Sequence, residues 1–331
     1  PRRSTITQPK PMNLSQLLTI GVPADGNLDT VREIQPGGLI FFERNAGTPP
    51  EMRRLARHAG EMLEIAPFVC IDHEGGRVQR LKDGFSLIPP AREVGKSGAQ
   101  AVMLSAMNAA AELRAAGINT NFAPVCDVPT HPDDTIIGNR AYSDNPIRAS
   151  LLAAEYVRGA QPSILCCAKH FPGHGGVGVD SHTGLPSFEG SRDELEAHLT
   201  PFRGAMAAGV ASMMIAHVQV PCLDESGAPA SLSQPIVTGL LREELGFRGL
   251  IWTDDLEMHA LNQDETGQNA VRAIAAGCDV ILVCHTRDKM LEAKAALEKA
   301  VRDGVLSEER VEDALNRVEW AKKRFGIIKS E

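Results

Sequence analysis

Eight short apolar runs, each followed by a loop and then a helical pattern, constrain the fold of this chain most. The runs cover residues 18–22, 38–42, 68–71, 118–125, 164–168, 211–216, 249–253 and 280–284. Most of the intervening segments are amphipathic, with helix starts at Ser191 and Ser307 and helix ends at Gly117, Gly209 and Gly277. Apolar runs that alternate with helices indicate parallel strands buried on both faces. We therefore predict an α/β fold consisting of a single (β/α)8 TIM-type barrel.

The remaining segments agree with one domain. Expected helices cover 50–63, 99–116, 145–159, 192–208, 235–245, 267–276, 288–301 and 308–325, of which the last two complete the outer ring. We find no linker or compositional break, and 331 residues suit a barrel of this kind. The prediction is a single catalytic domain over residues 1–331, with residues 1–14 as an N-terminal extension.

Composition excludes several classes of partner. Lys and Arg number 34 against 42 Asp and Glu, and the net charge of −8 disfavours nucleic acid. No apolar run approaches the roughly 18 residues of a membrane span, and the first twenty residues do not resemble a signal peptide. The seven cysteines lie mostly in apolar runs, where free thiols pack as small hydrophobes. We expect a soluble, cytoplasmic protein without a disulfide framework; the sequence does not indicate its oligomeric state.

Ionisable residues follow five consecutive predicted strands. They are Asp72, Glu74 and Arg80 after the third strand, Asp127 and Arg140 after the fourth, Lys169, His170, His174, Asp180 and His182 after the fifth, His217 after the sixth, and Asp254, Asp255 and Glu257 after the seventh. Catalytic groups of such barrels lie at the carboxyl ends of the strands. Helix capping explains one carboxylate of this kind but not five clusters, so we interpret the residues as a functional site.

Metal binding and phosphate binding are the first two interpretations of this site. His170 and His174 are four residues apart, with Asp180 and His182 as further ligands, but Pro172 makes a helix between the two imidazoles unfavourable. Lys169 would also repel a cation, and we expect no metal and no cofactor. Gly173, Gly175, Gly176 and Gly178 lack a phosphate-binding frame, so we interpret these glycines as hinges of a loop.

Sugar chemistry is the third interpretation. Glycoside hydrolysis needs a carboxylate against the anomeric carbon and a proton donor for the leaving oxygen. Asp254 suits the first role, and Asp180 can orient the imidazole of His182 for the second. Residues suited to bind hydroxyl and carbonyl groups are Asp72, Arg80, Arg140, Lys169 and His170. As an alternative, Arg77 and Arg140 could pair with strand-end carboxylates, which we favour for Arg77.

These motifs resemble those of glycoside hydrolase family 3, in particular its single-domain β-N-acetylglucosaminidase branch. The matching segments are IDHEGGRVQRL (71–81), NFAPVCDV (121–128), GNRAYSDNP (138–146), AKHFPGHGGVGVDSHTGLP (168–186), MIAHV (214–218) and TDDLEM (253–258). The resemblance implies a retaining mechanism with Asp254 as the nucleophile and Asp180 with His182 as the acid/base dyad. It also implies substrate-binding roles for Asp72, Arg80, Arg140, Lys169 and His170. The chain departs from the family pattern at His73, Cys126 and Glu257, which leaves fine substrate preference open.

The expected activity is exo-hydrolysis of terminal β-linked N-acetylglucosamine from muropeptide or related glycosides, by resemblance a step of peptidoglycan recycling. With only 2 Trp, 2 Tyr and 10 Phe, the chain suits a pocket for one terminal sugar better than a long groove. Two alternatives remain open. One is a phosphorylase on the same scaffold, because a His acid/base does not repel phosphate, and the other is a non-catalytic sugar-binding barrel.

Overall fold

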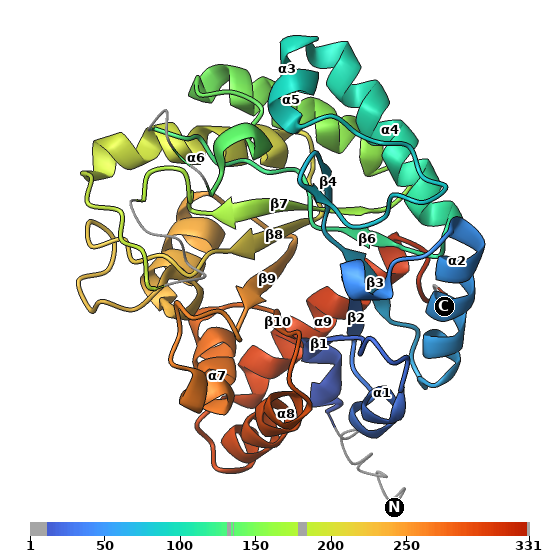
Figure 1. Cartoon of the computed structure of the whole chain (residues 1–331). Coiled ribbons are helices and arrows are strands. Elements are labelled where there is room, and N and C mark those ends of the chain that lie inside the picture. The colour runs from blue at the N-terminus through green and yellow to red at the C-terminus, as the bar shows by residue number, and fades with distance from the viewer. Residues whose placement is uncertain (1–11, 131–133, 135, 178–183, 330–331) are drawn as a thin grey trace, which may run out of the picture.

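The computed structural model describes residues 12–130, 134, 136–177 and 184–329, and its strands close into a parallel barrel (Figure 1). The barrel strands are β1 (Leu18–Gly21), β2 (Gly38–Phe41), β3 (Phe68–Ile71), β6 (Thr120–Asn121), β7 (Leu165–Phe171), β8 (Ser212–Ile215), β9 (Leu250–Asp255) and β10 (Val280–Val283). They pair in the order β1-β10-β9-β8-β7-β6-β3-β2, and β1 also pairs with β2. The predicted (β/α)8 barrel is confirmed.

Helices surround the barrel (Figure 1). They are α1 (Asp29–Ile34), α2 (Pro49–Glu61), α3 (Ala91–Lys96), α4 (Ala99–Ala115), α5 (Pro146–Ala160), α6 (Arg192–Ala207), the π-helix η5 (Pro235–Glu244), α7 (Thr266–Ala276), α8 (Arg287–Arg302) and α9 (Glu308–Arg324). Ser191 and Ser307 accept backbone N–H groups at the starts of α6 and α9, as predicted. Gly117, Gly209 and Gly277 have φ between 79° and 118°, which suits the helix ends predicted there. Among the described residues, we find no helix with the length and apolar content that crossing a bilayer requires.

Three strands differ clearly from their predicted bounds. The fourth strand is ladder-paired over Thr120–Asn121 rather than 118–125, with a further isolated bridge between Val125 and Lys169 of β7. The fifth strand continues to Phe171 and the seventh to Asp255, so that Lys169, His170 and Asp254 lie on strands rather than loops. Apolar runs end where side chains begin to line a cavity, although the backbone pairing continues. The sequence also did not predict α1, α3 or the hairpin of β4 (His73–Gly75) and β5 (Val78–Gln79).

A group of three aromatic rings packs together in the core of the barrel. Trp252 of β9 contacts Phe68 and Phe122 edge to face, each at a centroid distance of 5.3 Å. Beside the Phe68 ring, whose centroid is 5.3 Å from Lys322 Nζ, α9 packs against the short 3-10 helix η1 (Leu14–Leu17). Lys322 Nζ donates to Gln16 Oε1 at 2.7 Å. The ring of Phe122 also lines the cavity at the carboxyl ends of the strands, and Asp254 of β9 lines the same cavity.

Candidate active site

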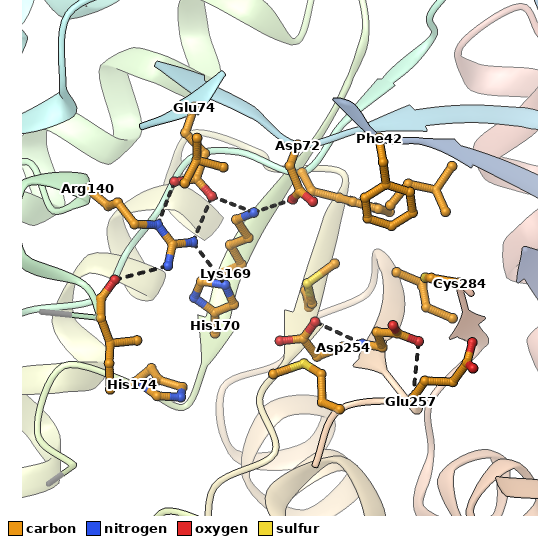
Figure 2. A pocket seen from close by; sticks show the side chains of 18 of the residues that line it. Phe42, Asp72, Glu74, Arg140, Lys169, His170, His174, Asp254, Glu257 and Cys284 are labelled. Carbon is orange, nitrogen blue, oxygen red and sulfur yellow. Dashed lines mark hydrogen bonds and ion pairs between the residues drawn. The ribbon is translucent and has the colours of Figure 1, made fainter. Parts of the chain in front are cut away.

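Side chains from the carboxyl ends of the strands line a cavity of about 410 Å3 (Figure 2). The lining includes every substrate-binding residue predicted from the sequence, namely Asp72, Arg80, Arg140, Lys169 and His170, together with Asp254. Asp180 and His182, the predicted acid/base dyad, lie outside the described residues. The structure thus brings six of the predicted site residues to one cavity.

Lys169 of β7 lies between two carboxylates at one side of the cavity (Figure 2). Its Nζ atom is 2.5 Å from Asp72 Oδ1 and 2.7 Å from Glu74 Oε1. Burial alone would lower the pKa of this ammonium, but the two carboxylates outweigh burial and raise it. Lys169 is therefore a fixed cation, able to donate but not to act as a base near neutral pH.

Arg140, from the short 3-10 helix η3 (Gly138–Arg140), binds Glu74 through two parallel hydrogen bonds of 2.8 Å each. Burial would raise the pKa of Glu74, but Arg140 and Lys169 hold it well below the ordinary range of a glutamate. Arg140 thus pairs with a strand-end carboxylate, as in the alternative that we gave to sugar binding. The Arg140 side chain also lines the cavity. Arg77, for which we favoured a carboxylate partner, donates to the carbonyl of Ile136.

Arg80 is less tightly held than Arg140. Its guanidinium lies 3.8 Å from Asp72 Oδ2, and the two side chains are 29% and 18% exposed. A planar guanidinium in this partly open position has donors left for a ligand in the cavity.

His170 is oriented by Asp127, a buried carboxylate. Its Nδ1 atom lies 2.7 Å from Asp127 Oδ2, and the backbone N–H of His174 donates to Asp127 Oδ1 at 2.7 Å. Burial would raise the pKa of Asp127, but the neighbouring His170 outweighs burial and lowers it. An ionised Asp127 fixes the proton of His170 on Nδ1, so that Nε2 is presented toward Arg140, 3.5 Å away.

Asp254 occupies a separate position near the end of β9. Its Oδ1 atom accepts the backbone N–H of Asp255 at 2.8 Å. Burial would raise the pKa of Asp254, but His170 and His217 on neighbouring strand ends outweigh it and lower the pKa. His217 itself is held between Ser231 Oγ, at 2.6 Å, and the carbonyl of Asp255, at 2.9 Å. The arrangement maintains an ionised carboxylate at the cavity surface.

The glycines after β7 have a packing role in the described part of the chain. A Cβ atom at Gly175 would lie 2.1 Å from the carbonyl oxygen of Val128, and Cβ atoms at Gly173 and Gly176 would lie 2.9 Å from His198. Close contact therefore explains these three glycines, whereas we had interpreted them as hinges. Gly178 lies outside the described residues.

The rings of His170 and His174 lie 6.1 Å apart, centroid to centroid. In the described part of the chain, we find no group of three or more His, Cys, Asp or Glu side chains placed to hold a metal ion. All seven cysteines are free, and six of them are buried.

Sequence reasoning placed Glu74, Asp127 and Asp255 among the strand-end residues of the site but gave none of them a specific role. Glu74 and Asp255 line the cavity, and Asp127 acts on it through His170. All three belong to the motif segments at the strand ends, so their position was a usable signal. Their roles were not recognisable because each depends on a partner from another strand.

Comparisons with known proteins give a consistent result. Residues 12–320 match the family model described as the glycosyl hydrolase family 3 N terminal domain. A protein of Idiomarina loihiensis named beta-hexosaminidase is 39% identical over 258 residues, which is 76% of this chain and 77% of that protein.

Solved structures are similar to this fold over nearly its whole length. A glycoside hydrolase family 3 beta-N-acetylglucosaminidase from Paenibacillus sp. superimposes with a TM-score of 0.93 at 36% identity, covering 96% of this chain and 63% of that one. A beta-N-acetylhexosaminidase from Beutenbergia cavernae superimposes with a TM-score of 0.87 at 28% identity, covering 94% of this chain and 97% of that one.

Proposed function

Because this chain belongs to glycosyl hydrolase family 3, we propose that it is a retaining exo-β-N-acetylglucosaminidase acting through a covalent glycosyl-enzyme intermediate. It is a glycoside hydrolase, and the relatives described above are named for hydrolysis of β-N-acetylhexosaminides. The observation that carries the proposal is Asp254, a partly buried carboxylate with a lowered pKa at the surface of the strand-end cavity.

In the proposed mechanism, an oxygen of Asp254 attacks the anomeric carbon while His182, oriented by Asp180, gives a proton to the leaving oxygen. His182 then takes a proton from the water that releases the sugar from Asp254. Asp180 and His182 both lie outside the described residues, so support for the role of this dyad comes from the sequence motif. Asp72, Arg80, Arg140, Lys169 and His170 would bind the sugar's hydroxyl and carbonyl groups.

The charge of the cavity supports water rather than phosphate as the second substrate. Among the described residues, the lining contains five carboxylates, on Asp72, Glu74, Asp254, Asp255 and Glu257, and three permanent cations, on Arg80, Arg140 and Lys169. Two of the cations are already paired with Glu74 or Asp72 at 2.8 Å or less. An incoming phosphate would therefore meet an excess of negative charge.

We also propose that muropeptide fragments are the physiological substrates and that the enzyme works in the cytoplasm in peptidoglycan recycling. The resemblance of the motifs supports the substrate. The free, mostly buried cysteines and the lack of a membrane-spanning helix in the described part of the chain agree with that location.

A chromogenic N-acetylglucosaminide and the matching glucoside, each incubated with and without phosphate, test the activity. We expect release of free N-acetylglucosamine from the first substrate. Preference for the glucoside, or a sugar 1-phosphate as product, would contradict the proposal.

Labelling with a fluorinated glycoside followed by peptide mapping tests the nucleophile. Asp254 should carry the label, and Asp254→Asn should abolish turnover, because attack on the anomeric carbon needs the carboxylate. Asp25→Asn, at an exposed position, is the control. A label on Asp255 would reassign the nucleophile, and a native enzyme that turns over without a label would indicate substrate-assisted chemistry.

A further inference from the structure

A second group of residues, outside the Lys169 cluster, surrounds Asp255 at the rim of the cavity. Figure 2 shows Glu257 and Cys284 on one side of Asp254, away from Lys169, Glu74 and Arg140. The residue after Cys284 is His285, whose side chain lines the cavity and is 49% exposed. Although half-exposed, this imidazole contacts charged groups through both of its nitrogens.

One nitrogen of His285 faces Arg44, from the short 3-10 helix η2 (Glu43–Asn45) after β2. Arg44 Nη1 lies 3.0 Å from His285 Nδ1. Arg44 is itself fixed, since it donates to the carbonyls of Val22 at 3.0 Å and Cys284 at 2.7 Å, and its guanidinium lies 4.5 Å from the centroid of the Phe42 ring. Because a guanidinium only donates, Nδ1 must accept, which leaves the imidazole proton on Nε2.

The other nitrogen of His285 faces Asp255. Nε2 lies 3.2 Å from Asp255 Oδ2, and Asp255 Oδ1 accepts the backbone N–H of Glu257 at 3.1 Å. The backbone of Asp255 is held as well, because its carbonyl is bound by His217 and its N–H donates to Asp254 Oδ1 at 2.8 Å. Arg44, His285 and Asp255 thus form a directed series of contacts that ends on Asp254.

We propose that Arg44 and His285 form a hydrogen-bond relay that orients Asp255 and, through its backbone N–H, the attacking carboxylate of Asp254. His285 is then a positioning residue for the reaction. This inference rests on the proposed function in one respect, the assignment of Asp254 as the nucleophile.

The loop that carries His285 is fixed independently of the imidazole. The Glu257 carboxylate accepts the backbone N–H groups of His285, at 2.5 Å, and Thr286, at 3.0 Å. Thr286 is the N-cap of α8, so the same carboxylate also stabilises the start of that helix. Changing the side chain of His285 therefore leaves its backbone anchored, which makes substitutions at this position interpretable.

Kinetics of three His285 variants test the relay. His285→Leu removes the donor to Asp255, and we expect kcat to fall about 10-fold to 100-fold with KM within about twofold, since one charge-assisted hydrogen bond is lost. His285→Gln keeps an N–H donor and should retain kcat within about threefold. His58→Leu, on the exposed face of α2, is the matched control. An unchanged kcat in His285→Leu would overturn the proposal. A rise in KM alone would also overturn it, because it would indicate that His285 contacts the substrate directly.

The tautomer of His285 provides a readout that does not depend on turnover. In 15N-labelled protein at pH 7, the imidazole signal that His285→Gln removes should have the pattern of the neutral Nε2–H tautomer. In Arg44→Met the signal should shift toward a mixture of tautomers, because Nδ1 loses its donor. A proton on Nδ1 in the native protein would refute the relay. The two proposals can fail separately. If the native protein has the expected tautomer but does not hydrolyse the N-acetylglucosaminide, the relay is supported and the proposed function is refuted.

Discussion

Replacing Glu74 by Gln should destabilise the protein strongly, because Glu74 is the shared carboxylate of two buried cations. Its side chain is 3% exposed, as is that of Lys169, and the side chain of Arg140 is 14% exposed. Removing one partner of a buried ion pair costs about 3 to 5 kcal/mol, because the other partner stays buried without compensation. Lys169 keeps Asp72, so the larger part of the loss is expected from Arg140.

Urea unfolding at pH 7 measures this loss of free energy directly. In thermal unfolding, with an unfolding entropy of roughly 2.1 cal/mol/K per residue over 331 residues, the same loss of about 3 to 5 kcal/mol lowers Tm by about 4 to 7 °C. Glu43→Gln is the matched control, since Glu43 pairs with Lys82 at 3.3 Å while both side chains are more than half exposed. It should cost less than about 1 kcal/mol.

The pH dependence gives a second check. The pKa of Glu74 is lower in the folded protein than in the unfolded chain, so its stabilising contribution is fully present above the unfolded value of about 4.3. It is lost as the pH falls through the lowered pKa of the folded state. The difference between native protein and Glu74→Gln should thus be constant from pH 7 to 5 and smaller at pH 3. A loss below about 1 kcal/mol at pH 7, or one that does not shrink at pH 3, would refute the reasoning.

Three further changes test other parts of the structure. Burial lowers the pKa of Lys322 to about 7, below its value in the unfolded chain. As the pH rises from 7 to 10, the free energy of unfolding of the native protein should therefore increase by about 3 to 4 kcal/mol relative to that of Lys322→Met, as measured by urea titration. Gly175→Ala places a Cβ atom 2.1 Å from a carbonyl oxygen and should cost about 1 to 3 kcal/mol, whereas Gly60→Ala, with space on α2, should not destabilise. Asp127→Asn should lower kcat/KM about 10-fold to 100-fold in the chromogenic assay, because His170 loses its charged partner; an unchanged value would exclude an orienting role.

The sequence predicted the barrel well because its signal is local. A strand buried on both faces needs a continuous apolar run, and a helix start needs a capping residue such as Ser191. The errors occurred at the strand ends, where Lys169 and Asp254 interrupt the apolar run although the backbone ladder continues. Side chains that line a cavity need not be apolar, so hydrophobicity alone places the end of such a strand too early.

The site was predictable only in part, for a related reason. Motifs identified the residues that converge on the cavity, such as Asp72 and His170, because strand ends of a barrel lie on one rim. Pairing between strands left no such signal, so the sequence did not reveal that Arg140 binds Glu74 or that Asp127 orients His170. The packing of Gly175 against Val128 is likewise a property of two distant segments.

Closure of the barrel between its first and last strands has a consequence for the order in which the molecule assembles. β1 pairs with β10, Arg44 contacts a residue 241 positions away, and Lys322 contacts one 306 positions away. Such distant contacts are slow to form, whereas helices form locally and early. During refolding, the helical circular dichroism signal should therefore return before enzymatic activity does. A nascent chain that lacks β10 would likewise lack the closed rim of strand ends on which Asp254 lies.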